Sequence, residues 1–173
     1  AAPADVVAFM VEQIGRLPPG TRTVLELAAA IGNQFELTTL AVVHERSQAD
    51  TAADLWPALA AGVVLPVDDA YRAFQHPDAA GATATEAPRG AVHYRFLHDR
   101  VQQAAYSMIA DADKPATHLA IGRLLLRSAS TQERDERLFD IVNQLDTGAA
   151  LIDERDERDE LARLNLAAGL KAK

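Results

Sequence analysis

The sequence predicts a mainly α-helical fold, in which a winged helix with a two-stranded β-hairpin is followed by antiparallel helical-repeat (TPR-like) hairpins. Apolar residues recur at helical spacing through most of the 173 residues. Two short stretches, 63–67 and 92–96, are instead rich in β-branched and aromatic residues or alternate apolar with polar, as strands do. Four helical stretches therefore lead into one hairpin, which is the order of a winged helix preceded by one extra helix.

The first four helices follow from apolar stripes and from the residues that end them. Pro18-Pro19-Gly20 ends the first stripe, and Gly32-Asn33 ends the second because these residues tolerate a left-handed C-cap. Asp54 is the predicted N-cap of the fourth helix, since Pro57 then falls in the first turn, where its missing N–H is not needed. The sequence thus predicts helices over 5–17, 21–31, 37–44 and 54–62.

The second half of the chain returns to helical spacing after the hairpin. Residues 79–90, mostly Ala, Gly, Thr and Pro, lack apolar bulk and are predicted to form a mobile hairpin tip. Helices are expected over 99–110, after Pro115 and over 138–145, with Gly122 at a close helix contact. We therefore expect two domains: 1–110, the extra helix and winged helix, and 111–173, the start of a helical-repeat superhelix.

Composition limits the setting in which the chain works. Hydrophobic residues make up 49% and charged residues 24%, which is typical of globular proteins. The absence of cysteine excludes disulfides and thiolate metal sites, and no apolar run is long enough to span a bilayer, so we expect a cytoplasmic protein. The start at Ala1 without Met and the end at Lys173 inside a helical pattern suggest a piece of a longer protein.

The charge distribution argues against nucleic-acid binding. A winged helix that reads DNA needs Lys or Arg on its third helix for phosphates and base edges. From residue 34 to residue 68 the sequence has one arginine, Arg46, and no lysine, against five acids. Trp56 and Leu59 instead give the corresponding helix an apolar face, so we expect it to dock onto protein.

Polar residues are concentrated where the second hairpin strand meets the next helix, in Leu97-His98-Asp99-Arg100. One interpretation is structural: Asp99 caps the helix and His98 packs locally. A second is a phosphate sensor, because His98 and Arg100 lie at a helix N-terminus. A third, weaker interpretation is the phosphoacceptor box of a histidine kinase, which is disfavoured because a strand pattern directly precedes His98.

Catalytic motifs are missing from the sequence. No Gly-rich loop ending in Gly-Lys-Ser/Thr and no serine nucleophile elbow occurs. A metal site built from His76, His98, Asp99 and Asp140 has no spacing that brings these groups together. We therefore expect no catalytic residue, no metal site and no bound cofactor in this chain.

Several longer strings carry a family resemblance. The string FLHDRVQQAAY (96–106), with RLPPGTRTVLELAAAIGNQFEL (16–37), HLAIGRLLL (118–126), ERLFDIVNQL (136–145) and LARLNLAAGLKAK (161–173), resembles the region after the ATPase core of large bacterial AAA/STAND signalling proteins. Those proteins join a serine/threonine-kinase-like domain, a predicted ATPase, helical repeats and often a sensor histidine kinase. In related proteins a Met-His-Asp motif of the winged helix places its histidine on the ADP β-phosphate, and Leu97-His98-Asp99 resembles that triplet.

The resemblance implies a regulatory role. It implies that His98 and Arg100 contact nucleotide, that ADP or ATP binds elsewhere in the parent kinase, and that the partners are the upstream nucleotide-binding domain, downstream helical repeats and other proteins. A protein-interaction scaffold without a nucleotide role is the first alternative, and a DNA-binding regulator is the second. No nucleic acid and no membrane are expected as partners.

Overall fold

The computed structural model describes residues 3–74 and 91–173. The chain divides into two compact units, 1–108 and 109–173. The expected hairpin tip, residues 79–90, lies outside the described residues, as does His76. The first unit contains α1 (Pro3–Gly15), α2 (Pro19–Ile31), β1 (Gln34–Glu36), α3 (Leu37–His44), α4 (Gln48–Ala60), β2 (Val64–Pro66), η1 (Asp69–Phe74), β3 (His93–Phe96) and α5 (Asp99–Ser107). The second contains α6 (Lys114–Ser128), α7 (Thr131–Glu136), α8 (Leu138–Thr147), η3 (Ala149–Leu151) and α9 (Arg155–Lys171).

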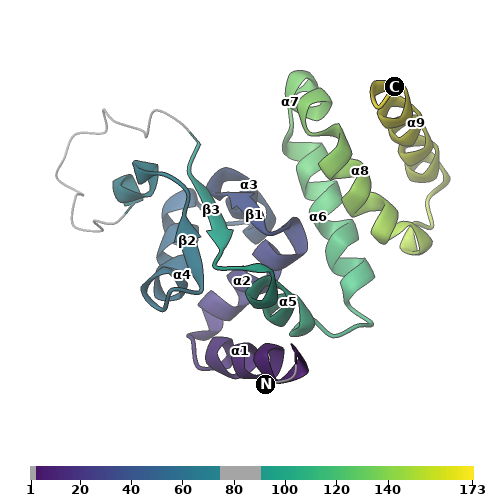
Figure 1. The fold of residues 1–173 in the computed structure, drawn as a ribbon. Coiled ribbons are helices and arrows are strands. Elements are labelled where there is room, and N and C mark those ends of the chain that lie inside the picture. The colour runs from purple at the N-terminus through teal and green to yellow at the C-terminus, as the bar shows by residue number, and fades with distance from the viewer. Residues whose placement is uncertain (1–2, 75–90) are drawn as a thin grey trace. The chain divides into compact units, whose positions relative to one another are not determined.

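The mainly helical class is confirmed, and the predicted hairpin pairs β2 with β3 (Figure 1). The sheet has a third strand that the sequence analysis missed. β1 pairs antiparallel with β3, so β3 lies at the centre and the strand order is β1-β3-β2. The register places Phe35 opposite Tyr94 and Val64 opposite Phe96.

The inner face of this sheet is aromatic. Phe35, Tyr94 and Phe96 are all buried, and the Phe35 ring centroid lies 5.9 Å from that of Tyr94 and 5.7 Å from that of Phe96. The alternation predicted for β3 is confirmed, since His93 and Arg95 are exposed. Burial raises the pKa of the Tyr94 phenol to about 12, because the charged form is poorly solvated there.

The helices of the first unit pack around this aromatic layer. α2 packs on α4 and α5, and α1 packs on α5. Their fully buried residues include Ile14, Leu25, Leu37, Leu40 and Leu55. A continuous apolar core therefore joins every helix of the unit to the sheet.

One edge of the sheet is formed by β2. Val67 N–H donates to the His93 carbonyl, so Pro66, one residue earlier, directs its nitrogen away from β3. A proline is tolerated there because an edge strand has no neighbour waiting for that N–H.

The fourth predicted helix begins earlier than expected. α4 starts at Gln48, because the Ser47 hydroxyl accepts a hydrogen bond from the Asp50 N–H at 3.0 Å and caps the helix. The prediction that Asp54 is the N-cap is wrong. Pro57 consequently lies inside the helix, where it withholds an N–H from the carbonyl of Ala53.

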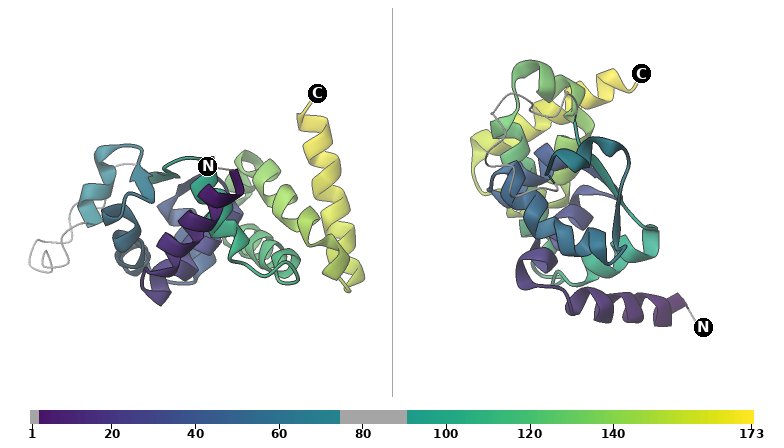
Figure 2. Two further views of the ribbon diagram at one scale, coloured as in Figure 1. Left: turned by 60° about the horizontal axis from the view of Figure 1, so that its bottom comes forward. Right: turned by 90° about the vertical axis from the view of Figure 1, so that its left-hand side faces the viewer.

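The second unit is an antiparallel set of helices. α6 packs along α8, and α8 packs along α9. The left view of Figure 2 shows α9 as one unbroken helix in yellow. His118 of α6 and Gln144 of α8 are both buried, with 2.7 Å between His118 Nδ1 and Gln144 Oε1. Asn165 of α9 donates to Asp146 of α8 at 2.8 Å.

The predicted close contact at Gly122 is confirmed. A Cβ added to Gly122 would lie 2.7 Å from Leu145 Cδ2 and 3.1 Å from the Leu145 backbone nitrogen. Gly148 is equally crowded, since its added Cβ would lie 2.5 Å from the Pro115 carbonyl oxygen. Glycine at these two positions lets α6 and α8 approach each other closely.

We expect Gly122→Ala to lower the free energy of unfolding by about 1–3 kcal/mol, because the added methyl group overpacks the contact between α6 and α8. Gly169→Ala is the matched control, since a Cβ there meets nothing within 4 Å. It should raise stability by about 0.5–1 kcal/mol through helix propensity. Urea denaturation followed by circular dichroism measures both, and equal changes in the two variants would contradict the close packing.

Candidate functional site

An apolar stripe runs along the outer side of α4. Ala49, Ala53, Trp56 and Ala60 recur at steps of four, three and four residues and are all exposed, with Trp56 47% exposed. The opposite side of the same helix carries Leu55 and other residues buried in the core. We call the four exposed residues the α4 stripe.

The cluster beneath α4 fixes its position. The Asp54 carboxylate forms an ion pair with Arg46 at 2.7 Å. The Asp54 backbone carbonyl accepts a hydrogen bond from the Thr21 hydroxyl, also at 2.7 Å. His44 lies between Thr51 and Asp54, with Nδ1 3.4 Å from Thr51 Oγ1 and Nε2 3.8 Å from Asp54 Oδ2. α4 is thus tied to α2 and α3 by polar contacts as well as by the core.

The charges around the α4 stripe are acidic. Glu45 and Asp50 are exposed near the start of α4. Arg46, the one arginine between residues 34 and 68, is paired with Asp54. A phosphate backbone would therefore meet carboxylates here, and the surface suits an apolar protein partner better.

His98 occupies the N-cap position of α5, so the structural interpretation, in which Asp99 caps the helix and His98 packs locally, is wrong on both points. Its backbone is extended (φ −164°, ψ 170°), and its carbonyl oxygen accepts from the Val101 N–H at 2.9 Å. The His98 side chain is exposed and makes no capping hydrogen bond. Asp99 is instead the first residue of the helix, where a carboxylate complements the helix dipole.

Arg100 lies next to His98 and is also exposed. Its Nη1 donates a long hydrogen bond of 3.5 Å to Gln103 Oε1. The structure thus brings an exposed imidazole and an exposed guanidinium to the start of one helix. Both donors suit a phosphate that approaches from outside the unit, although the exposed Asp99 carboxylate between them opposes an anion.

Of the residues considered for a metal site, His98, Asp99 and Asp140 are described by the structure and His76 is not. Within residues 3–74 and 91–173, no three His, Asp or Glu side chains gather closely enough to hold a metal ion. In the same ranges no helix is both long and apolar enough to cross a membrane.

Sequence reasoning found Trp56 but missed Ala49 and Ala53, because it began α4 at Asp54. The available signal was Ser47 followed by Asp50, a serine cap with an acid in the first turn. Leu59, predicted on the same apolar face, is half-buried and packs on the core of the unit.

The fold and surface define a class of chain: a mainly helical module with an exposed apolar stripe and a basic pair at a helix start. The chain is also similar to a short part of a known protein. The chain is 29% identical to hybrid signal transduction histidine kinase G of Dictyostelium discoideum, in an alignment 198 positions long that covers 97% of the chain. The chain spans about 6% of that kinase's length. No protein-family model and no solved structure matches it.

The cluster beneath α4 should make stability depend on pH. Burial lowers the pKa of His44 below its ordinary value of 6.5, and Arg46 acts in the same direction, while Asp54 and Asp50 oppose them. The unfolded chain therefore binds this proton more tightly than the folded chain. We expect the stability that neutral His44 contributes to be fully present above pH 6.5. The free energy of unfolding should then fall as the pH drops through 6.5 toward the folded pKa.

Urea denaturation at a series of pH values between 7.5 and 5 tests this on the wild type and on His44→Gln. The glutamine keeps a neutral hydrogen-bonding side chain beside Thr51, so this variant should lose less stability on acidification. An identical decline in both proteins would assign the effect to other groups.

Proposed function

We propose that this chain is a non-catalytic regulatory and interaction segment of a large ATP-binding signal-transduction kinase. In this role it couples the nucleotide state of an upstream ATPase domain to kinase output in the cytoplasm. The observation that carries the proposal is the α4 stripe, an exposed apolar surface on a helix that the core already holds in place. The similarity to a segment of a signal-transduction histidine kinase supports it.

In the first step of the proposal, the winged-helix module within residues 1–110 docks its α4 stripe on the upstream nucleotide-binding domain. Trp56 has nearly half its surface in water, so a partner that covers it lowers the free energy of the complex. The alanines on either side leave the helix backbone accessible to a close neighbour. The acids Glu45 and Asp50 would lie at the rim of that contact.

In the second step, docking brings His98 and Arg100 to the phosphates of ADP. Bound ADP supplies a negatively charged β-phosphate, and the imidazole and guanidinium would hold it by charge-assisted hydrogen bonds. Their exposure and the absence of a capping bond to the His98 side chain fit this role. Release of ADP would then free the module, and the helices of 109–173 would transmit the change.

A scaffold without a nucleotide role is the alternative, and one observation favours it. The Asp99 carboxylate already complements the N-terminus of α5, so the helix needs no phosphate to complete it. The two functions share the α4 stripe but differ at His98. A DNA-binding regulator has no comparable support, because Arg46 is paired with Asp54.

The docking step predicts that Trp56→Ala in the full-length kinase speeds ADP dissociation by about tenfold, because the module no longer closes. The stability of the 173-residue chain should change by no more than about 0.5 kcal/mol, since the side chain is exposed. Phe9→Ala, at an aromatic residue of α1 that is 53% exposed, is the matched control and should leave the rate unchanged. Stopped-flow release of a fluorescent ADP analogue measures the rates of the wild type and both variants, and urea denaturation measures the stability. An unchanged rate in Trp56→Ala would rule out docking through α4.

The phosphate-sensing step predicts that His98→Ala in the same protein also speeds ADP release by about tenfold, through loss of a hydrogen bond to a charged group. His93→Ala, at an exposed histidine of β3, should release ADP at the wild-type rate. If Trp56→Ala accelerates release and His98→Ala does not, the module docks without touching phosphate. Tight binding of the 173-residue chain to duplex DNA would contradict the proposal as a whole.

A further inference from the structure

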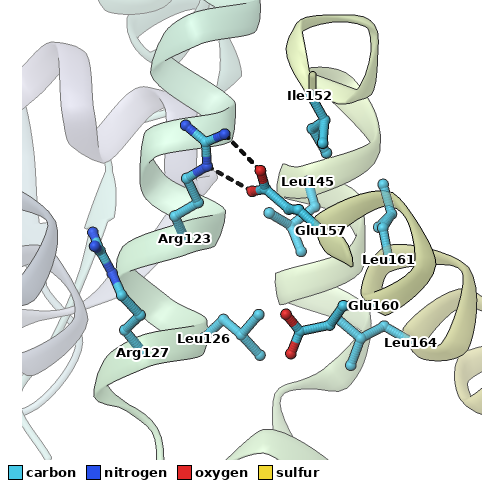
Figure 3. Close-up of a pocket in the computed structure, with 9 residues that line it drawn as sticks. All are labelled: Arg123, Leu126, Arg127, Leu145, Ile152, Glu157, Glu160, Leu161 and Leu164. Carbon is cyan, nitrogen blue, oxygen red and sulfur yellow. Dashed lines mark hydrogen bonds and ion pairs between the residues drawn. The ribbon is translucent and has the colours of Figure 1, made fainter. Parts of the chain in front are cut away.

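The second unit contains a groove between α6 and α9, with α8 as its floor (Figure 3). Its cavity volume is about 270 Å³, and its apolar lining is entirely aliphatic: Leu126, Leu145, Ile152, Leu161 and Leu164. Leu145, Ile152 and Leu161 are buried, while Leu126 and Leu164 are half-buried and remain accessible at the mouth. A partner that enters the groove therefore meets hydrocarbon first.

One end of the groove is closed by an ion pair across it. Arg123 of α6 donates from Nε and Nη2 to the two carboxylate oxygens of Glu157 in α9, at 2.6 and 2.8 Å (Figure 3). This hydrogen bonding holds the pKa of the Glu157 carboxyl below its usual range. The paired charges satisfy each other and set the width of the groove at this end.

The rest of the rim carries two charges that do not pair. Arg127 on α6 and Glu160 on α9 are both exposed, and among the described residues no ion pair joins either of them to another group. In Figure 3 the Glu160 carboxylate points across the groove toward Leu126. In the same figure Arg127 lies on α6 with its guanidinium turned away from α9, so the positive charge of the α6 side lies at its outer edge, whereas Glu160 makes the α9 side anionic at the mouth itself.

We propose that this groove binds an amphipathic helix of a partner protein, with an aliphatic stripe flanked by acidic residues toward α6 and basic residues toward α9. The aliphatic floor selects the stripe, and Arg127 and Glu160 select the flanks. A helix fits better than an extended peptide, because side chains of three helices line the groove and no strand edge offers hydrogen bonds to a foreign backbone. A helix already satisfies its own backbone.

This surface is separate from the proposed nucleotide coupling. It uses none of the residues of the α4 stripe, and it contains neither His98 nor Arg100. Loss of helix binding would leave ADP release unchanged, so the two proposals fail independently.

Three synthetic peptides of about 14 residues, roughly four helical turns, test the inference on the 173-residue chain. All three share one leucine stripe. The mixed peptide carries glutamate on one flank of the stripe and lysine on the other. The glutamate-flanked peptide carries glutamate on both flanks, and the lysine-flanked peptide carries lysine on both. Because a helix can dock in either direction, the mixed peptide always has one matching orientation. We expect fluorescence anisotropy to show it binding about three- to fivefold more tightly than either of the others.

The rim charges should then reverse this preference. Glu160→Lys makes both sides of the mouth cationic and should bind the glutamate-flanked peptide best. Arg127→Glu makes both sides anionic and should bind the lysine-flanked peptide best. Both positions are exposed, so the fold should be retained. The same order of peptides in all three proteins would overturn the proposal, because the net charge of −8, rather than the rim, would then govern binding.

A second pair of variants tests the apolar floor. Leu126→Gln at the groove mouth should weaken the mixed peptide about tenfold through the lost apolar contact. Leu166→Gln is the control, because Leu166 is 66% exposed on α9 and does not line the groove. Weakening by Leu166→Gln as strong as that by Leu126→Gln would show that binding is not specific to the groove, and would overturn the proposal.

Discussion

The first unit depends on the two-residue period of its central strand. β3 turns Tyr94 and Phe96 onto Phe35 and leaves His93 and Arg95 in water. Since β3 pairs with both β1 and β2 and leads directly into α5, this one register fixes the sheet, the core beneath it and the exposed start of α5. A shift by one residue would bury arginine and expose the aromatic rings.

Most of the fold was predictable because its signals are local. Apolar spacing predicted α1 to α6, α8 and the helical pattern that reaches Lys173, and the strand pattern predicted the pairing of β2 with β3. Apolar spacing did not predict α7, because Thr131–Glu136 contains no apolar residue. β1 was missed because three residues, Gln34 to Glu36, are too few to show an alternation, and the partner that makes them a strand lies about 60 residues later. Pro57 misplaced the start of α4, because the core around Leu55 holds a proline inside a helix that local rules would end.

Of the surfaces proposed for function, some could be predicted from local sequence and one could not. Trp56 and His98 could be chosen from the sequence, because a bulky apolar residue and an imidazole at a helix start stand out locally. The groove of the second unit could not, since Arg123 and Glu157 are 34 residues apart and nothing in either segment marks the other as its partner. Such a site exists only once α8 has brought α6 and α9 into position.

Pro66 has a consequence for how this chain associates with others. On the side of β2 that faces away from β3, Pro66 has no N–H to donate to an incoming strand. β2 is also three residues long, which limits the number of hydrogen bonds that such a strand could form. Growth of the sheet from this side is therefore disfavoured, which protects this edge from edge-to-edge aggregation. Both surfaces proposed for recognition are accordingly helical, and a helix presents side chains to a partner and keeps its own backbone hydrogen bonds.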